Sequence, residues 1–371
     1  MRIGVPKEIK NNEYRVGLTP ASVREFRAQG HELLVQTGAG AAIGLPDALY
    51  QQAGARIAPD AAAVFAWAQM IVKVKEPQPA ECLMLREGQI LYTYLHLAPD
   101  PVQTAALLKS GAVCIAYETV TGAAGGLPLL APMSEVAGRM AIQAGAAHLE
   151  KSKGGMGLLL GGVPGVVPAQ VLILGGGVVG TNALQMAVGL GARVTVVDRN
   201  VDRLRVLDLS FGNRIATVFS TTHAIEEHIA QADLVIGGVL IPGAAAPKLI
   251  SRAMVAGMKP GAVIVDVAID QGGCCETSHA TTHADPTYVV DGVVHYCVAN
   301  MPGAVPRTST FALNNATLAH GLAVAGKGWQ AAAAEDVHLR AGLNVVLGRV
   351  TCEAVARELG YDYTDATLLL S

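Results

Sequence analysis

The stretch that decides the fold runs from Val171 to Asp198 and reads VLILGGGVVGTNALQMAVGLGARVTVVD. An apolar segment leads into a GxGxxG turn, a segment with helical spacing follows, and a second apolar segment ends in an aspartate. This order is typical of a strand, a phosphate-binding turn, a helix and a second strand. We therefore predict a dinucleotide-binding unit, in which unpaired N–H groups at the start of the helix face the phosphates.

Each glycine of the turn has its own physical role. Gly175 permits the tight turn, Gly177 lets the backbone approach a pyrophosphate, and Gly180 lets the helix pack on its strand. A glycine turn alone is a weak signal. The strand, the helix and the terminal acid lie in register with it here, so a turn without a ligand is the less favoured interpretation.

The acid at the end of the second strand indicates which dinucleotide binds. Asp198 lies 23 positions after Gly175, where its carboxylate can accept hydrogen bonds from the adenosine ribose. This favours NAD over NADP, because an acid at this point would repel a 2′-phosphate. The competing signal is the pair Arg199 and Arg203, which can neutralise such a phosphate.

Length and composition exclude several classes of protein. The chain has 371 residues, which favours two domains over one core. Its composition is 51% hydrophobic and 15% charged with 42 glycines, which suits packed α/β layers rather than disorder. The net charge is −3 and there is no run of Lys or Arg, so we expect a small-molecule substrate rather than nucleic acid or a membrane surface.

Neither a targeting signal nor a cysteine motif is recognisable. The N-terminal segment lacks the apolar region of a secretory signal, so we expect a cytoplasmic protein. The six cysteines show no CxxC spacing, which favours reduced thiols over zinc or disulfides. A redox switch at Cys274 and Cys275 is the less favoured alternative. The uncharged stretch 154–192 contains Pro164 and Pro168 as well as the glycine turn, so we do not interpret it as a membrane span.

Strand and helix signals alternate through the first third of the chain and predict a parallel sheet covered on both faces. The predicted strands are 2–6, 31–36, 70–75, 89–94 and 112–118, and the predicted helices are 20–29, 47–53, 79–86 and 101–110. After the glycine turn we predict helices 201–209 and 223–230, strands 216–220, 234–237 and 262–268, and an edge hairpin 288–297. From 309 onward the pattern is helical, with helices 309–325, 330–342 and 352–359.

These C-terminal helices have no sheet of their own, so we expect them to return to the N-terminal sheet. The Gly/Pro-rich passage 122–132 indicates a crossing between domains, after which Ser134 caps a helix reaching about residue 152. The predicted fold class is α/β with two doubly wound domains. A central Rossmann domain, 129–306, is inserted in a discontinuous substrate domain, 1–128 and 307–371.

Charged side chains follow the carboxyl ends of three predicted strands in the first domain. Lys75 closes the strand 70–75 on the same face as Lys73, His96 follows the strand 89–94, and Arg15 lies nine residues after Pro6. Ligands of open α/β sheets bind at this edge. A lysine there can polarise a carbonyl, an arginine can bind a carboxylate, and a histidine can transfer a proton.

Any one of these residues alone is best interpreted as an ordinary surface or loop residue. Their coincidence favours a site for a small keto or amino acid. Asp270 follows the predicted strand 262–268 of the nucleotide sheet, from which we expect it to face the nicotinamide.

At this point the chain resembles the alanine dehydrogenase family, and the resemblance runs from end to end. It is carried by GVPKEIKNNEYRVGLTP, IVKVKEP, LHLAPD, LLAPMSEVAGRMA, the glycine turn, DLVIGGVLIPGAAAPKL, VDVAIDQGGC and VANMPGAVPRTST. The family is similar in fold to the NAD-binding component of proton-translocating transhydrogenase. The resemblance implies NAD-dependent, reversible oxidative deamination of L-alanine to pyruvate and ammonium.

The resemblance also implies roles for individual residues. Arg15 and Lys75 would bind the substrate's carboxylate and carbonyl, and His96 and Asp270 would be the catalytic proton-transfer and orienting pair. The residues implied around NAD are Ser134, Gly175, Gly177, Val178, Val179, Gly180, Asp198, Arg203, Ser220, Val239, Leu240, Val267, Ala268, Ile269, Asp270, Val298, Ala299, Asn300 and Met301.

Some relatives differ from this chain in ways that change the expectation. Some have Arg at the position of His279, and some carry Glu and His able to hold magnesium where this chain has Ala323 and Lys327. We therefore expect no metal site. The family implies a homohexamer. The alternatives are a transhydrogenase component, a dehydrogenase of another small amino acid, or an inactive NAD-binding regulatory protein.

Overall fold

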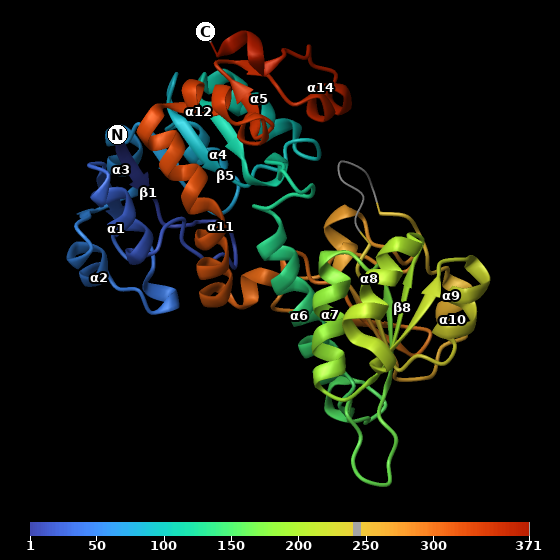
Figure 1. The fold of residues 1–371 in the computed structure, drawn as a ribbon. Coiled ribbons are helices and arrows are strands. Elements are labelled where there is room, and N and C mark those ends of the chain that lie inside the picture. The colour runs from blue at the N-terminus through green and yellow to red at the C-terminus, as the bar shows by residue number, and fades with distance from the viewer. Residues whose placement is uncertain (240–245, 371) are drawn as a thin grey trace. The chain divides into compact units, whose positions relative to one another are not determined.

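The computed structural model describes residues 1–239 and 246–370. The chain divides into two compact units, Met1–Met133 with Val305–Ser371, and Ser134–Ala304. Figure 1 shows the blue N-terminal and red C-terminal parts of the chain together in the first unit, and the green to yellow middle of the chain in the second. The inserted unit thus begins at Ser134 rather than 129 and ends at Ala304 rather than 306.

An eight-stranded sheet forms the centre of the first unit among the described residues, with the order β15-β14-β6-β5-β4-β1-β2-β3. The strands are β1 (Arg2–Val5), β2 (Glu32–Gln36), β3 (Arg56–Ala58), β4 (Met70–Val72), β5 (Ile90–Thr93), β6 (Val113–Ala116), β14 (Leu343–Val346) and β15 (Arg349–Val350). Strands β1 to β6 pair in parallel. Strand β14 pairs with β6, and β15 with β14, in antiparallel fashion.

Helices cover both faces of this sheet. They are α1 (Pro20–Ala28), α2 (Asp47–Gln52), α3 (Ala61–Trp67), α4 (Pro79–Cys82), α5 (Pro101–Ser110), α11 (Pro306–Lys327), α12 (Trp329–Glu335), α13 (Val337–Arg340) and α14 (Glu353–Leu359). Met70 and Val72 of β4 pack in one apolar cluster with residues of α1, α11 and α12. Ile71 packs in another with residues of α3, α5 and α14. The alternation follows from the period of two along a strand, and the C-terminal helices return to the N-terminal sheet as predicted.

The prediction of a purely helical C-terminal segment is wrong for residues 343–350. The run Leu343-Asn-Val-Val forms β14 beside β6, and the chain turns back into β15 at Leu347 and Gly348. Both turn residues have positive φ angles, +49° and +79°, as a two-residue hairpin of this twist requires. Strand β3 and helix α3 were also not predicted.

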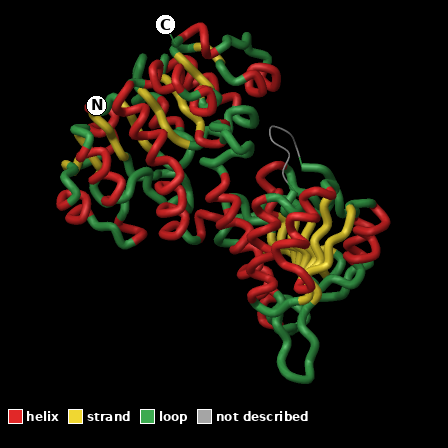
Figure 2. Tube along the Cα trace, in the orientation of Figure 1, coloured by secondary structure: helices red, strands yellow, loops and turns green. Residues whose placement is uncertain are grey.

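The second unit is built on a seven-stranded sheet within the described part of the chain, with the order β12-β13-β11-β10-β7-β8-β9. The strands are β7 (Gln170–Leu174), β8 (Arg193–Asp198), β9 (Ile215–Phe219), β10 (Leu234–Gly237), β11 (Val263–Asp266), β12 (Thr287–Val290) and β13 (Val293–Tyr296). All pairs are parallel except the predicted edge hairpin β12–β13. The helices are α6 (Ala131–His148), α7 (Val178–Gly189), α8 (Val201–Phe211), α9 (Thr222–Ile229) and α10 (Arg252–Ala256); Figure 2 shows these strands in yellow among red helices.

The two sheets share one plan. In each, the chain starts at a central strand, adds two strands on one side, and then crosses to the other side, which holds five strands in the first sheet and four in the second. The crossing leaves β1 beside β4 in the first unit and β7 beside β10 in the second. Such a reversal is where ligands bind in open α/β sheets, so both predicted doubly wound folds place a binding edge at the carboxyl ends of these strands.

The predicted role of Ser134 as a helix cap is wrong. Helix α6 begins at Ala131 and ends at His148, so Ser134 is the fourth residue of the helix. Pro132 falls in the first turn, where its fixed φ angle and missing N–H are compatible with a helix start. The proline therefore marks the beginning of the helix rather than the end of the preceding loop.

Close backbone contacts hold the glycine turn against its surroundings. A Cβ at Gly180 would lie 1.7 Å from the carbonyl oxygen of Gly175, so no larger residue fits there. A Cβ at Gly138 of α6 would lie 2.2 Å from the carbonyl oxygen of Val179, so α6 also packs closely on α7. None of the described helices is long and apolar enough to cross a bilayer.

We predict that Gly180→Ala destabilises the protein by about 3 kcal/mol or more, because the new methyl group overlaps backbone and not a flexible side chain. The matched control is Gly189→Ala at the other end of α7, where the new Cβ would meet no described atom within 4 Å. That change should be neutral or stabilising by about 0.5–1 kcal/mol. Urea unfolding followed by circular dichroism measures both; equal stability of the two variants would contradict the prediction.

Candidate functional site

The glycine turn is shaped to receive an anion. Gly175 has a φ of +95°, which favours glycine, and Gly177 immediately precedes α7. Among the described residues, no side chain caps α7, and a Cβ at Gly177 would meet no atom within 4 Å. The N–H groups of Val178, Val179 and Gly180, in the first turn of α7, therefore have no capping side chain. The space beside Gly177 is open, as a bound pyrophosphate requires.

The carboxylate of Asp198 fixes the conformation of this turn. Its Oδ2 accepts a hydrogen bond from the N–H of Gly176 at 2.6 Å, and its Oδ1 accepts one from Asn200 at 2.8 Å. Arg203 donates from Nε to the carbonyl oxygen of Gly176 at 2.6 Å and also bonds the hydroxyl of Thr181. Its guanidinium is thus held by the turn, which weakens the competing interpretation of Arg203 as a 2′-phosphate ligand.

The other residues implied around the nucleotide follow the carboxyl ends of neighbouring strands. Ser220 follows β9, Val239 follows β10, residues 267–270 form a 3-10 turn after β11, and residues 298–301 follow β13. The exceptions are Ser134, which lies within α6, and Leu240, which lies outside the described residues. Asn300 has a φ of +58°, and its carbonyl oxygen accepts a hydrogen bond from His283 at 3.2 Å.

Asp266, which was not predicted as a functional residue, holds the loop that carries Asp270. It is fully buried at the end of β11, and its carboxylate accepts hydrogen bonds from the N–H groups of Ala268, Cys274 and Cys275. It also accepts one from the hydroxyl of Ser278 at 2.6 Å. Asp270 itself is exposed on this loop. The sequence contains one sign of this role: Asp266 lies inside the apolar run VIVDVA, and a buried acid must have hydrogen-bond partners.

Cys274 and Cys275, which are adjacent in the chain, are free and buried, as expected of reduced thiols. Burial raises the pKa of Cys274 well above the ordinary value and raises that of Cys275 as well. Both therefore remain protonated and unreactive at neutral pH, which disfavours the redox-switch alternative.

In the first unit, Arg15, Lys75 and His96 follow three neighbouring parallel strands, β1, β4 and β5. Arg15 is 2% exposed, and its Nε donates to Glu13 Oε1 at 2.6 Å while Nη2 pairs with Glu13 Oε2. Its Nη1 contacts the sulfur of Met133 at 3.0 Å. Glu13 was not predicted; it fixes the plane of the guanidinium through two parallel hydrogen bonds.

Lys75 lies beyond the end of β4, which is shorter than predicted. The Nζ of Lys75 lies 3.5 Å from Glu76 Oε2, and Lys10 pairs with Glu76 Oε1. Burial raises the pKa of Glu76, but the charges of Lys75 and Lys10 outweigh it and hold this pKa at about 2. The ammonium group of Lys75 is therefore already paired with one acid.

His96 is the most accessible of the three residues. It has a φ of +51°, and its N–H donates to Glu118 Oε1 at 2.6 Å. The ring stacks on Tyr94, with centroids 5.8 Å apart and planes at 6°, and the imidazole is 42% exposed. Glu118 holds the backbone N–H and also lies 3.9 Å from the ring Nδ1, and Tyr94 fixes the ring plane. The partly exposed ring suits a proton-transfer group.

We predict that Glu76→Gln lowers the free energy of unfolding at neutral pH by about 1–2 kcal/mol, because it removes a partly buried acid with two cationic partners. The folded-state pKa lies below the ordinary 4.5, so the contribution is present above pH 4.5 and is lost as pH falls toward about 2. Wild type and variant should converge there in urea unfolding. As control, Glu335→Gln breaks an exposed pair with Lys327 and should change little.

No group of three or more potential ligands among His, Cys, Asp and Glu lies close enough to hold a metal ion within the described residues. Ala323 and Lys327 both lie on α11, and Lys327 pairs with Glu335 of α12. Of these two positions, Lys327 is thus part of an ion pair between two helices.

The fold and the glycine turn define the class: a nucleotide-binding α/β protein of two doubly wound units. Residues 4–137 match the family model "Alanine dehydrogenase/PNT, N-terminal domain". Residues 141–353 match the family model "Alanine dehydrogenase/PNT, C-terminal domain". The chain is 61% identical to an alanine dehydrogenase of Halomonas elongata, over all of both chains.

Solved structures agree with these matches. One titled L-alanine dehydrogenase superposes with a TM-score of 0.94 at 52% identity, covering 97% of this chain and 99% of its own. A transhydrogenase of Sinorhizobium meliloti superposes with a TM-score of 0.81 at 26% identity, covering 95% and 100%. The chain belongs to the alanine dehydrogenase family of oxidoreductases.

Proposed function

We propose that the protein catalyses the NAD-dependent, reversible oxidative deamination of L-alanine. In this reaction L-alanine, NAD⁺ and water give pyruvate, ammonium, NADH and a proton. The observation that carries the proposal is the set of Arg15, Lys75 and His96 after three adjacent parallel strands. Full-length identity to alanine dehydrogenases supports it.

The first unit would bind the substrate and the second the nucleotide. Arg15, whose guanidinium Glu13 holds in plane, would bind the carboxylate. Lys75 would supply positive charge at the carbonyl oxygen of pyruvate, and at the equivalent position of the reaction intermediates. These two cations would orient the substrate and stabilise the negative charge on its oxygens.

His96 would move the protons of the reaction. Its partly exposed ring would take a proton from the water that attacks the imine, and would return one to the departing ammonia. The family resemblance assigns the orienting role to Asp270, which is exposed on the loop that Asp266 fixes. The two carboxylates therefore differ in role, because Asp266 is occupied by backbone N–H groups whereas Asp270 is accessible.

The nucleotide that fits the turn best is NAD. The open space at Gly177 and the first turn of α7 would hold its pyrophosphate, and Asp198 would accept hydrogen bonds from the ribose. Ser220, Val239, Leu240 and the segments 267–270 and 298–301 would surround the remainder, together with Ser134. When bound, NAD⁺ supplies the acceptor for the hydride that leaves the substrate's Cα.

The alternative activity is that of a transhydrogenase component, which passes hydride between two nucleotides. The 26% identity to the Sinorhizobium meliloti protein, against 61% to the Halomonas elongata alanine dehydrogenase, disfavours it. A dehydrogenase of another small amino acid remains the second candidate, because the residues that would bind the substrate's carboxylate leave its side-chain preference open. We further propose, from the family resemblance, a cytoplasmic homohexamer.

We predict that the purified protein reduces NAD⁺ with L-alanine and that NADP⁺ serves poorly, because Asp198 repels its phosphate. Initial rates of absorbance change with L-alanine, glycine, L-serine and L-2-aminobutyrate measure the substrate preference directly. Comparable kcat/KM for NADP⁺ would contradict the cofactor assignment, and a higher kcat/KM for another amino acid would replace L-alanine as the substrate.

We predict that His96→Ala lowers kcat by about 10²–10⁴-fold, the usual contribution of a positioned acid–base group. Binding of NADH, followed by its fluorescence, should remain unchanged because the nucleotide turn lies in the other unit. His223→Ala, at an exposed histidine of α9, is the control and should keep the wild-type rate. A His96→Ala enzyme with a near-normal rate would remove His96 from the mechanism.

A further inference from the structure

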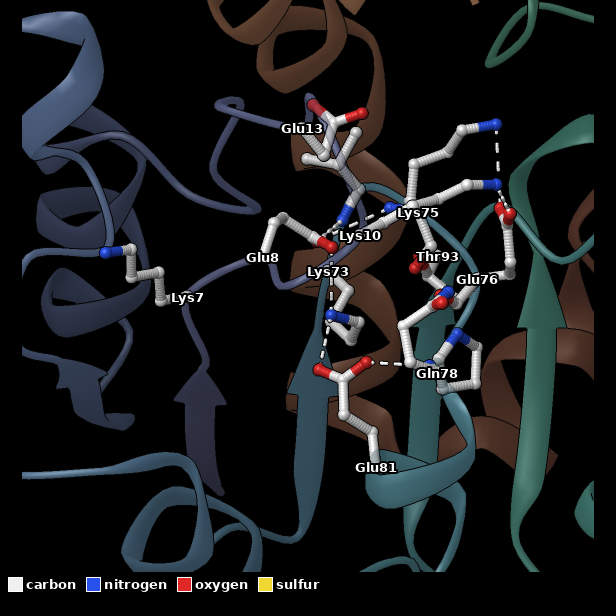
Figure 3. Close-up of polar contacts among 12 residues, drawn as sticks. Lys7, Glu8, Lys10, Glu13, Lys73, Lys75, Glu76, Gln78, Glu81 and Thr93 are labelled. Atoms are coloured by element: carbon white, nitrogen blue, oxygen red, sulfur yellow. Dashed lines mark hydrogen bonds and ion pairs between the residues drawn. The ribbon is translucent and has the colours of Figure 1, made fainter.

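A group of three buried charged side chains lies beside Lys75 and is not part of the proposed chemistry. Lys73 is 0% exposed, and its Nζ lies 2.9 Å from Glu8 Oε2 and 2.7 Å from Glu81 Oε1. Glu8 and Glu81 are also buried. Figure 3 shows Lys73 between the two carboxylates, with Lys75 and Lys10 directed to Glu76 nearby.

Burying three charges opposes folding unless each has several partners, so their arrangement needs a physical reason. Each carboxylate uses its second oxygen on a different piece of backbone. Glu8 Oε1 accepts hydrogen bonds from the N–H groups of Val74 at 2.7 Å and Lys75 at 3.4 Å. Glu81 Oε2 accepts one from Gln78 at 2.8 Å. Of these two acids, Glu8 therefore contacts the segment that carries Lys75.

This contact lies just beyond the end of β4. Lys73 still donates its N–H to Tyr92, and Tyr94 donates to the carbonyl oxygen of Val74, as in a parallel ladder. The N–H of Val74 leaves the ladder and turns to Glu8. Glu8 follows β1, so the contact ties the exits of the two central strands together at the reversal of the sheet.

Two further side chains hold the same backbone from the other side. The hydroxyl of Thr93, at the end of β5, donates to the carbonyl oxygen of Lys75 at 2.9 Å. The hydroxyl of Tyr117, just beyond β6, donates to the carbonyl oxygen of Lys73 at 3.1 Å. The backbone of residues 73–75 is thus fixed at both carbonyl and N–H groups, and Glu8 is its charged contact.

We propose that Glu8 is a positioning residue for substrate binding, which sets the place of Lys75 through the backbone of residues 74 and 75 while Lys73 keeps its carboxylate in place. This inference rests on the proposed role of Lys75 as a substrate ligand. Displacement of a binding group by about 1 Å lowers activity by up to about 100-fold, so small changes at Glu8 should reach the substrate.

The matched pair of variants is Glu8→Gln and Glu81→Gln. Each removes one carboxylate charge from Lys73 and keeps the shape of the side chain. We expect Glu8→Gln to raise the KM for pyruvate by about tenfold with a smaller change in kcat, because a misplaced Lys75 binds substrate less well. Glu81→Gln should change this KM by about twofold or less, and the dissociation constant of NADH should be unchanged in both.

A double-variant cycle with Lys75→Met tests whether Glu8 acts through Lys75. If it does, Glu8→Gln has little further effect on the KM for pyruvate once Lys75 is replaced. Additive effects of the two changes, or equal KM values for Glu8→Gln and Glu81→Gln, would overturn the proposal. A normal KM for Lys75→Met alone would instead contradict the proposed function, so the two failures are distinguishable.

Loss of folding is controlled separately. If Glu8→Gln does not fold, Glu8→Asp keeps the charge beside Lys73 but draws the oxygens back from Val74 and Lys75 by one methylene. The expected result is again a raised KM for pyruvate with native circular dichroism. Failure of both variants to fold, or a folded Glu8→Asp protein with wild-type KM, would assign Glu8 to stability alone and overturn the proposal.

Discussion

Parallel pairing on both sides of a single central strand is the constraint from which both units follow. Strand β1 pairs with β2 and β4, and β7 pairs with β8 and β10. Parallel neighbours need long crossovers, and all their carboxyl ends meet at one edge. Residues far apart in the chain, such as Arg15, Lys75 and His96, therefore follow adjacent strands because of the strand order alone.

The same kind of interaction fixes the loops at the carboxyl edge of each sheet. In each unit a carboxylate with little or no exposure accepts backbone N–H groups and so fixes the loop beside it: Glu8 for the segment of Lys75, and Asp266 for the loop of Asp270. Asp198 does the same for the glycine turn. Each acid provides an acceptor for backbone N–H groups that would otherwise stay unpaired.

The sequence predicts those parts in which several local signals agree. The strand, glycine turn and helix of the second unit, and the edge hairpin, lie within a few residues of their predicted places, because periodicity, turn residues and caps coincide. Strand β14 was missed because its partner, β6, lies far away in sequence and its turn lacks Asn or Asp. Glu8, Glu13 and Asp266 were missed because the pairing of buried charges is a tertiary property. Its local signs are the lysine within MIVKV and the aspartate within VIVDVA.

The chain has two tryptophans, Trp67 at the end of α3 and Trp329 at the start of α12, and both belong to the first unit. Intrinsic tryptophan fluorescence therefore reports the environment of one half of the molecule only. If the nucleotide unit unfolded by itself, no tryptophan within it would report the change. Circular dichroism, in contrast, senses both units. A difference between the two optical transitions would thus directly measure how independently the inserted unit unfolds.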